Sequence, residues 1–88
     1  MTRRERIEAK LQADFNPAAM QVVDESAKHA GHAGASPSGE THYDVAIEAT
    51  AFTGLSRVAR ARAVHEALAT EFSSGLHALA LKLRAPGE

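Results

Sequence analysis

One stretch decides the fold, and it reads Glu40-Thr-His-Tyr-Asp-Val-Ala-Ile-Glu48. If this stretch is extended, one of its sides carries Thr41, Tyr43, Val45 and Ile47, and the other carries His42, Asp44, Ala46 and Glu48. A period of two, with apolar residues on one side, is typical of a strand with one covered face. The stretch therefore predicts a strand that packs its tyrosine and aliphatic side chains under another layer.

The residues before this strand predict a helix, a second strand and a loop. Thr2 and Glu5 have the spacing of a capping box. Apolar residues recur at every fourth position, at Ile7, Leu11 and Phe15, as on the buried face of a helix. We expect this helix to run to about Asp14 and to be ended by Pro17. A short β-prone run then covers residues 20–24, and residues 27–39 predict a flexible glycine-rich loop.

The residues after it predict a long helix and a last strand. Ser56 is a candidate N-cap, Gly75 stands at a helix stop, and the apolar period between them is carried by Val64, Leu68 and Phe72. The last strand should run from Leu76 to Leu83, followed by a tail over 84–88. By period two, the row that packs on the helices would be His77, Leu79, Leu81 and Leu83.

These elements predict an α+β fold in the order α-β-β-α-β, as a single domain over residues 1–88. The first two strands should pair antiparallel, and the helical crossover should make the second and third strands parallel neighbours. The expected architecture is a three-stranded mixed sheet with helices packed on one face.

Composition narrows the classes of function. The chain of 88 residues has no cysteine, five histidines and a formal net charge of −1. It has neither a membrane span nor the apolar core of a signal peptide, so we expect a cytoplasmic protein without membrane contact. The charge does not favour nucleic acid. No GxSxG elbow, P-loop or HExxH motif organises a catalytic site, and we expect no enzyme.

The histidines are the candidate metal ligands. His29 and His32 have two residues between them in the glycine-rich loop, and His77 opens the last strand. His-only sites of two or three ligands leave coordination positions open, so such a site would be catalytic or shared with a partner. The spacing alone leaves two alternatives open. The loop histidines could be solvated without a metal, and His77 could be a core histidine. His42 is most simply a polar strand residue with a local hydrogen bond, and His65 a helix-surface residue.

Arg57, Arg60 and Arg62 form the densest basic cluster. At about 100° per residue, Arg60 and Arg62 diverge by roughly 160° around a helix, so the cluster cannot form one stripe. A solvated helix face explains it most simply.

Several short motifs, in order and spacing, resemble the BolA family over nearly the whole chain. They are Val23-Asp-Glu-Ser26, His29, Gly39-Glu-Thr-His-Tyr43, Phe52-Thr-Gly54, Ser56-Arg-Val58, Arg60-Ala-Arg62 and Leu76-His-Ala-Leu79. The resemblance implies a class II KH-like α+β fold, in agreement with the layers expected from periodicity.

The resemblance also implies a function. BolA-like proteins form heterocomplexes with monothiol, CGFS-type glutaredoxins and share a [2Fe-2S] cluster with them and with glutathione. Carried over by position, the ligands from this chain would be His77 and His29, with His32 as a substitute for His29. Some family members bind promoter DNA through a helix-turn-helix-like surface, which here would involve Arg57, Arg60 and Arg62.

The chain departs from the family pattern at three positions. Tyr43 replaces a usual Phe, Ala61 interrupts a common Arg-His-Arg, and His65 stands where an aromatic residue is frequent. The change at Ala61 weakens the DNA interpretation, and we expect DNA binding to be weak. Whether the chain forms a homodimer in isolation stays open.

Overall fold

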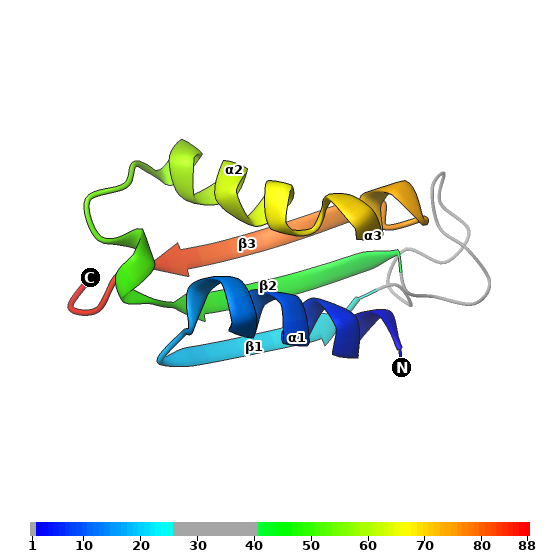
Figure 1. Ribbon diagram of the computed structural model, residues 1–88, viewed down its shortest axis with the longest axis horizontal. Helices are drawn as coiled ribbons and strands as arrows, with labels where there is room; N and C mark the ends of the chain where they lie inside the picture. The colour runs from blue at the N-terminus through cyan, green and yellow to red at the C-terminus, as the bar shows by residue number, and fades with distance from the viewer. Residues whose placement is uncertain (1, 26–40) are drawn as a thin grey trace.

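The computed structural model describes residues 2–25 and 41–88, which fold into a sheet with helices on one side (Figure 1). The elements follow one another as α1 (Arg3–Phe15), β1 (Ala19–Asp24), β2 (His42–Glu48), the 3-10 turn η2 (Thr50–Phe52), α2 (Arg57–Ala67), α3 (Ala69–Ser73) and β3 (Ala78–Arg84). The predicted α+β class and the predicted order of helices and strands are confirmed. The expected loop over 27–39 lies outside the described residues.

β2 is the central strand of a three-stranded sheet in the order β1-β2-β3. It pairs antiparallel with β1, so that Val22 faces Val45, and parallel with β3, so that Tyr43 faces Leu79. Both pairings were predicted. A parallel pair needs a crossover connection, and η2, α2 and α3 supply it.

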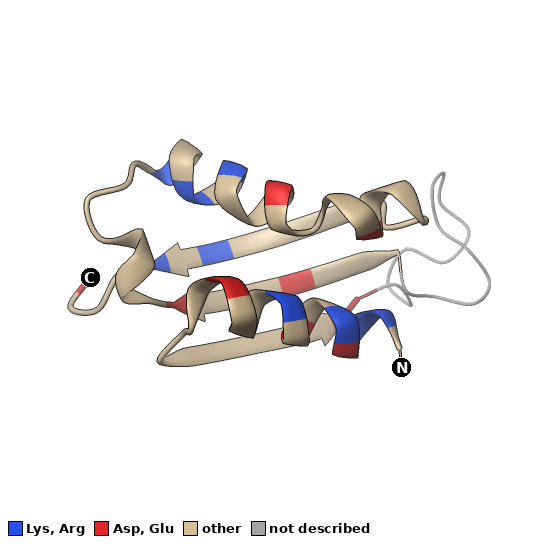
Figure 2. Ribbon diagram, viewed as in Figure 1, with Lys and Arg blue, Asp and Glu red and all other residues tan. Residues whose placement is uncertain are grey.

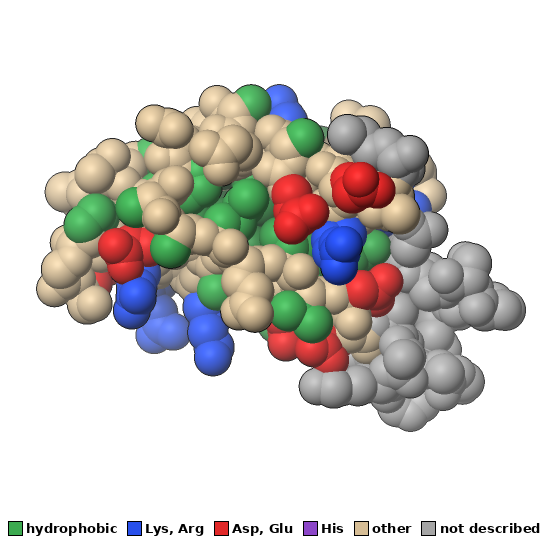
Figure 3. All heavy atoms as spheres, turned by 90° about the horizontal axis from the view of Figure 1, so that it is seen from below, with side chains coloured by type: hydrophobic (Ala, Val, Ile, Leu, Met, Phe, Trp, Pro, Cys, Tyr) green, Lys and Arg blue, Asp and Glu red, His purple; other side chains and the backbone are tan. Residues whose placement is uncertain are grey.

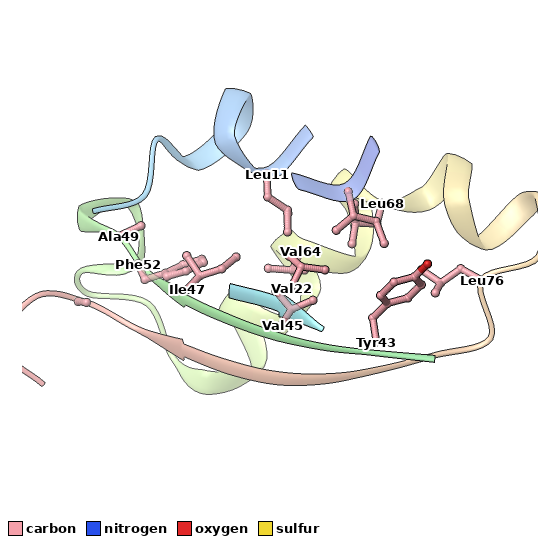
Figure 4. Packing of buried hydrophobic residues seen from close by; sticks show 12 residues of the cluster. Leu11, Val22, Tyr43, Val45, Ile47, Ala49, Phe52, Val64, Leu68 and Leu76 are labelled. Carbon is pink, nitrogen blue, oxygen red and sulfur yellow. The ribbon is translucent and has the colours of Figure 1, made fainter. Parts of the chain in front are cut away.

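The hydrophobic core lies between this sheet and the helices. Figure 4 shows Leu11 of α1 pointing toward the strands and Val45 of β2 pointing back toward the helices. Leu11 and Val64 are fully buried, and Val45 is 1% exposed. Burying an aliphatic side chain of this size stabilises the fold by about 1.5–3 kcal/mol relative to leaving it in water. The side of the central strand that was predicted to be covered is therefore the side that contacts the core.

The capping box predicted for α1 is present. The Glu5 N–H donates to Thr2 Oγ1 at 3.2 Å, and the Thr2 N–H donates to Glu5 Oε1 at 2.9 Å. These hydrogen bonds lower the pKa of the Glu5 carboxyl, the one from the Thr2 backbone most. The helix ends at Asn16, whose φ of 44° is left-handed, directly before Pro17.

The expected single helix from Ser56 to Gly75 is interrupted at Leu68. The Leu68 backbone has φ −101° and ψ 17°, outside the α region, while its side chain is 1% exposed in the core. The periodicity of the sequence continues through this break, which is why it was not predicted. No helix within residues 2–25 and 41–88 is long and apolar enough to cross a membrane.

The expected tail over 84–88 is wrong. Arg84 is the last residue of β3, Ala85 is 3% exposed in the core, and Glu88 is bonded to α2. A single alanine between Arg84 and Pro86 gave no sign of burial in the sequence.

Candidate metal-binding site and basic groove

His77 does not lie on the helix-covered row where the sequence placed it. β3 begins at Ala78, and the His77 side chain is exposed, whereas Leu76 before it is 4% exposed in the core. The reason is the helix end: the Leu76 N–H donates to Glu71 O at 2.9 Å and the Gly75 N–H to Phe72 O at 3.4 Å. This Schellman pattern buries the residue after the glycine. Strand alternation therefore starts later than predicted.

The backbone of His77 is fixed by β2. The carbonyl of Thr41 accepts the N–H of His77 at 2.8 Å and the N–H of Ala78 at 3.1 Å. These two bonds start the parallel pairing and bring His77 to the end of the sheet at which β2 begins.

Among the described residues, His42 and His77 lie side by side at this end. The ring centroids of His42 and His77 are 5.3 Å apart, with the ring planes tilted by 53°. His42 is 8% exposed, and its Nδ1 lies 2.9 Å from Thr41 Oγ1. The local hydrogen bond expected for His42 is present, but its contact with His77 was not anticipated. The predicted parallel pairing of the second and third strands could have indicated this contact, because that pairing sets His42 opposite Ala78.

The donor set of this pair fits a metal shared with a partner. A ring nitrogen lies about 2 Å from a bound metal, so two imidazoles on one tetrahedral ion have centroids about 5 Å apart. A hydroxyl bonded to the second ring nitrogen is the kind of outer contact that orients a ligating histidine. Within residues 2–25 and 41–88, no group of three or more His, Asp or Glu side chains is placed to hold a metal by itself.

The other predicted loop ligands, His29 and His32, lie outside the described residues. The residues that flank their segment are described, and both lie at this same end. The Glu25 N–H donates to the carbonyl of His42 at 2.8 Å, and Thr41 is bonded to His77. His65 is exposed on α2 and stacks on Phe72 at a centroid distance of 5.1 Å, as expected of a helix-surface residue.

The arginines of α2 are separated by burial. Arg57 and Arg62 are exposed, but Arg60 is 7% exposed. Its Nε donates to Leu55 O at 3.0 Å and its Nη1 to Leu83 O at 3.2 Å, and the guanidinium also holds the Glu88 carboxylate through Nη2 at 2.6 Å. The solvated face expected for this cluster is thus wrong for Arg60, which ties α2 to the end of β3.

A basic groove lies beside Arg60, far along β3 from His77. It has a volume of about 650 Å³ and takes its basic lining from Arg57, Arg60, Lys82 and Arg84. Lys and Arg lie on α2 and on the end of β3 (Figure 2), and Figure 3 shows basic side chains projecting from that end of the molecule. Glu48 offsets part of this charge, because its Oε1 lies 2.9 Å from Arg84 Nη2.

Comparison with known proteins assigns the chain to a family. A sequence model described as BolA-like protein matches residues 11–88. The chain belongs to the BolA-like family. It is 47% identical over 89 residues to an "Uncharacterized protein in cobS 5'region" of a Sinorhizobium species, covering 100% of this chain and 96% of that one.

Two further relatives bear on fold and function. The BolA-like chain is 45% identical over 78 residues to the DNA-binding transcriptional regulator BolA of Escherichia coli strain K12, covering 89% of this chain and 70% of the regulator. The solved BolA domain of SufE1 from Arabidopsis thaliana superposes with a TM-score of 0.89 at 40% identity, over 98% of this chain and 94% of that one. The chain spans 24% of the length of the full SufE-like protein 1 of that plant.

The Arg60 contacts generate a pH prediction. The hydrogen bonds from Arg60, and next the one from the Ala85 N–H, lower the pKa of Glu88 to about 2 from 4.5. Arg60→Ala should return this pKa most of the way to 4.5, and Arg62→Ala should leave it near 2, as measured by NMR titration of the Glu88 carboxyl.

The same pair should contribute to stability with a defined sign. Because the folded pKa lies below the unfolded one, the contribution is present above about pH 4.5 and is lost as the pH falls toward 2. Arg60→Ala should therefore lower the urea midpoint at pH 7, unlike Arg62→Ala. Equal midpoints for the two variants would contradict a structural role for Arg60.

Proposed function

We propose that this BolA-like chain is a non-enzymatic adaptor for iron-sulfur clusters. It would bind a [2Fe-2S] cluster together with a monothiol, CGFS-type glutaredoxin and glutathione, and His77 would be its principal ligand. The cluster is the cargo of such an adaptor. The adaptor would either hand the cluster on or regulate the glutaredoxin that carries it.

The observation that carries this proposal is the presentation of His77. Its side chain is exposed, while its backbone N–H is bonded to Thr41 O and its ring is 5.3 Å from that of His42. An exposed imidazole on a fixed backbone can reach a metal held by a partner. It loses less conformational freedom on binding than a mobile side chain would.

The composition supports a shared site. The chain has no cysteine, so thiolates must come from outside it. Two imidazoles from this chain and two thiolates from the glutaredoxin and glutathione would form a His₂Cys₂ ligand set. That set, known from Rieske centres, raises the reduction potential of a [2Fe-2S] cluster relative to one held by thiolates alone.

The second imidazole has two sources. The family resemblance supports His29, with His32 as its substitute. The described residues on either side of their segment, Glu25 and Thr41, are hydrogen-bonded to the backbones of His42 and His77. His42 is the alternative, because its ring already lies beside His77. Its 8% exposure disfavours direct contact with a cluster shared between two proteins, so we place the loop ligand first.

The first prediction of this proposal concerns His77. His77→Ala should abolish the visible absorption of the cluster when the chain is mixed with a CGFS glutaredoxin, glutathione, iron and sulfide, because one ligand is lost. The fold should persist, since the side chain is exposed and its removal opens no cavity. His65→Ala, which removes another exposed histidine, is the matched control. A wild-type cluster spectrum from His77→Ala would exclude His77 as a ligand.

A second prediction separates the loop ligands from His42. His29→Ala should shorten the lifetime of the cluster, and the double variant with His32→Ala should shorten it further, because the remaining loop imidazole can replace the first only weakly. His42→Ala should retain the cluster. Loss of the cluster in His42→Ala, with unchanged lifetimes in both loop variants, would assign the second ligand to His42.

DNA binding is a second candidate function, supported by the basic groove and by the name of the Escherichia coli relative. The groove changes which residues would contact phosphate. Arg60 is engaged with Glu88 and two carbonyls, so the contacts would fall to Arg57 and Lys82, with Arg84 shared with Glu48. So few contacts, on a chain with a net charge of −1, give only weak and non-specific binding.

This candidate makes a prediction about salt. Arg57→Ala and Lys82→Ala should each reduce the slope of log affinity against log salt by about 0.9, while wild-type affinity stays at about 10⁻⁴ to 10⁻⁶ M at physiological salt. Fluorescence anisotropy with one duplex and its scrambled copy measures both quantities. Nanomolar affinity for one duplex over the other would make the regulator the main function.

A further inference from the structure

A buried arginine from the start of the chain holds the turn that leads to His77. Arg3 is 9% exposed, and its Nη1 donates to the Glu71 carbonyl at 3.0 Å, to Glu71 Oε1 at 2.8 Å and to Ser74 Oγ at 2.9 Å. Its Nη2 donates to the Ser74 carbonyl at 3.0 Å. One guanidinium therefore binds the Ser74 carbonyl, just past the end of α3, and adds a hydrogen bond to the Glu71 carbonyl, which also accepts the N–H groups of Ser74 and Leu76.

The guanidinium is also packed against the turn. Gly75 has a φ of +124°, and a Cβ added there would lie 3.3 Å from Arg3 Nη2. The backbone conformation at Gly75 favours glycine, and a side chain there would also press on the Arg3 guanidinium. α3 is only five residues long, too short to be stable by its own hydrogen bonds, so its end depends on such external contacts.

A second arginine completes the network. Arg6 Nε lies 3.0 Å from Glu71 Oε2, and Arg6 Nη2 lies 3.0 Å from Glu71 Oε1. The hydrogen bond from Arg6, followed by the charges of Arg6 and Arg3, lowers the pKa of the Glu71 carboxyl against the opposing effect of burial. The carboxylate is thus ionised at neutral pH and joins both arginines of α1 to α3.

The held turn and the His77 backbone are continuous. Leu76 N–H is bonded to Glu71 O, and the next N–H, that of His77, is bonded to Thr41 O. The direction in which the His77 side chain leaves the backbone is set between these two bonds. If the Glu71–Ser74 segment shifts, the turn no longer supports the bonds to Thr41 in holding His77 beside His42.

We propose that Arg3 is a positioning residue for His77. It clamps the α3–β3 turn from α1 and so sets the place of the His77 imidazole relative to His42 and to a metal that the imidazole binds. The metal-binding part of this inference rests on the proposed cluster function, whereas the placement of His77 does not. In this proposal Arg3 acts on His77 through the backbone of the turn.

The test compares Arg3→Gln with Arg4→Gln. Arg4 is on the same helix, but its pair with Glu8 is exposed and 3.9 Å long. Two quantities are measured: the NMR shifts of the His77 ring together with the cross-relaxation between the His42 and His77 rings in the isolated chain, and the lifetime of the cluster in the glutaredoxin complex.

Arg3→Gln should move the His77 ring signals and weaken the contact with His42. It should also shorten the cluster lifetime by about three- to tenfold. This effect is no larger than the roughly 10–100-fold loss of metal affinity or activity that follows when a ligand loses a direct hydrogen-bond partner. Arg3→Lys should give an intermediate effect, because lysine keeps the charge and loses the planar fork. Arg4→Gln should match wild type in both measurements.

Val64→Ala is the control for a general loss of stability. It weakens the core away from the turn and should leave the His77 signals in place. If Arg3→Gln does not fold, Ser74→Ala removes one contact of the guanidinium, together with the hydrogen bond from Ser74 Oγ to Glu71 O, keeps every charge, and should move the His77 signals less than the loss of the whole guanidinium would. A folded Arg3→Gln with wild-type His77 signals, or Val64→Ala moving those signals equally, would overturn the positioning role. Moved signals with an unchanged cluster, in a protein whose His77→Ala variant also keeps its cluster, would instead overturn the proposed function alone.

Discussion

The carbonyl oxygen of Thr41 is the contact on which the functional end of this protein depends. It accepts the N–H groups of both His77 and Ala78, and so starts the parallel pairing of β2 with β3. Because parallel strands begin at the same edge of a sheet, the residues that open them become neighbours. His42 and His77 come together for this reason, although 34 residues separate them along the chain.

Parallel pairing in turn requires a crossover, and the protein fixes both ends of that crossover with a buried arginine. At the beginning of α2, Arg60 binds the carbonyls of Leu55 and Leu83 and the carboxylate of Glu88. After α3, Arg3 binds the carbonyls of Glu71 and Ser74 and the carboxylate of Glu71. Arginine suits both places, because its rigid fork donates to several acceptors at once and its charge is compensated by a carboxylate. The aliphatic core stabilises the layers, while these contacts set where the crossover begins and ends.

The periodic parts of the chain could be predicted from sequence because burial on one face leaves a repeat. The strand over Thr41 to Glu48 and the α1 capping box are of this kind, and so are the pairings of the three strands. The contacts that could not be predicted depend on residues far apart in the chain. The predicted period-two row holds for Leu79, Leu81 and Leu83, which pack against the core, but it is wrong for His77, because a Schellman turn, and not a strand, decides where Leu76 and His77 point. A basic cluster on a helix gave no sign that Arg60 is buried, since its acceptors lie on another strand and at Glu88.

The central claim is that the His77 imidazole binds iron in a cluster shared with a glutaredoxin. The most direct measurement is pulsed EPR of the reduced cluster in the complex, with ¹⁵N-histidine incorporated into this chain and the glutaredoxin unlabelled. The account predicts strong coupling to a directly bound nitrogen that changes from the ¹⁴N to the ¹⁵N pattern when only this chain is labelled. Weak nitrogen coupling that does not change on labelling would mean that no histidine of this chain binds the cluster, and would contradict the account.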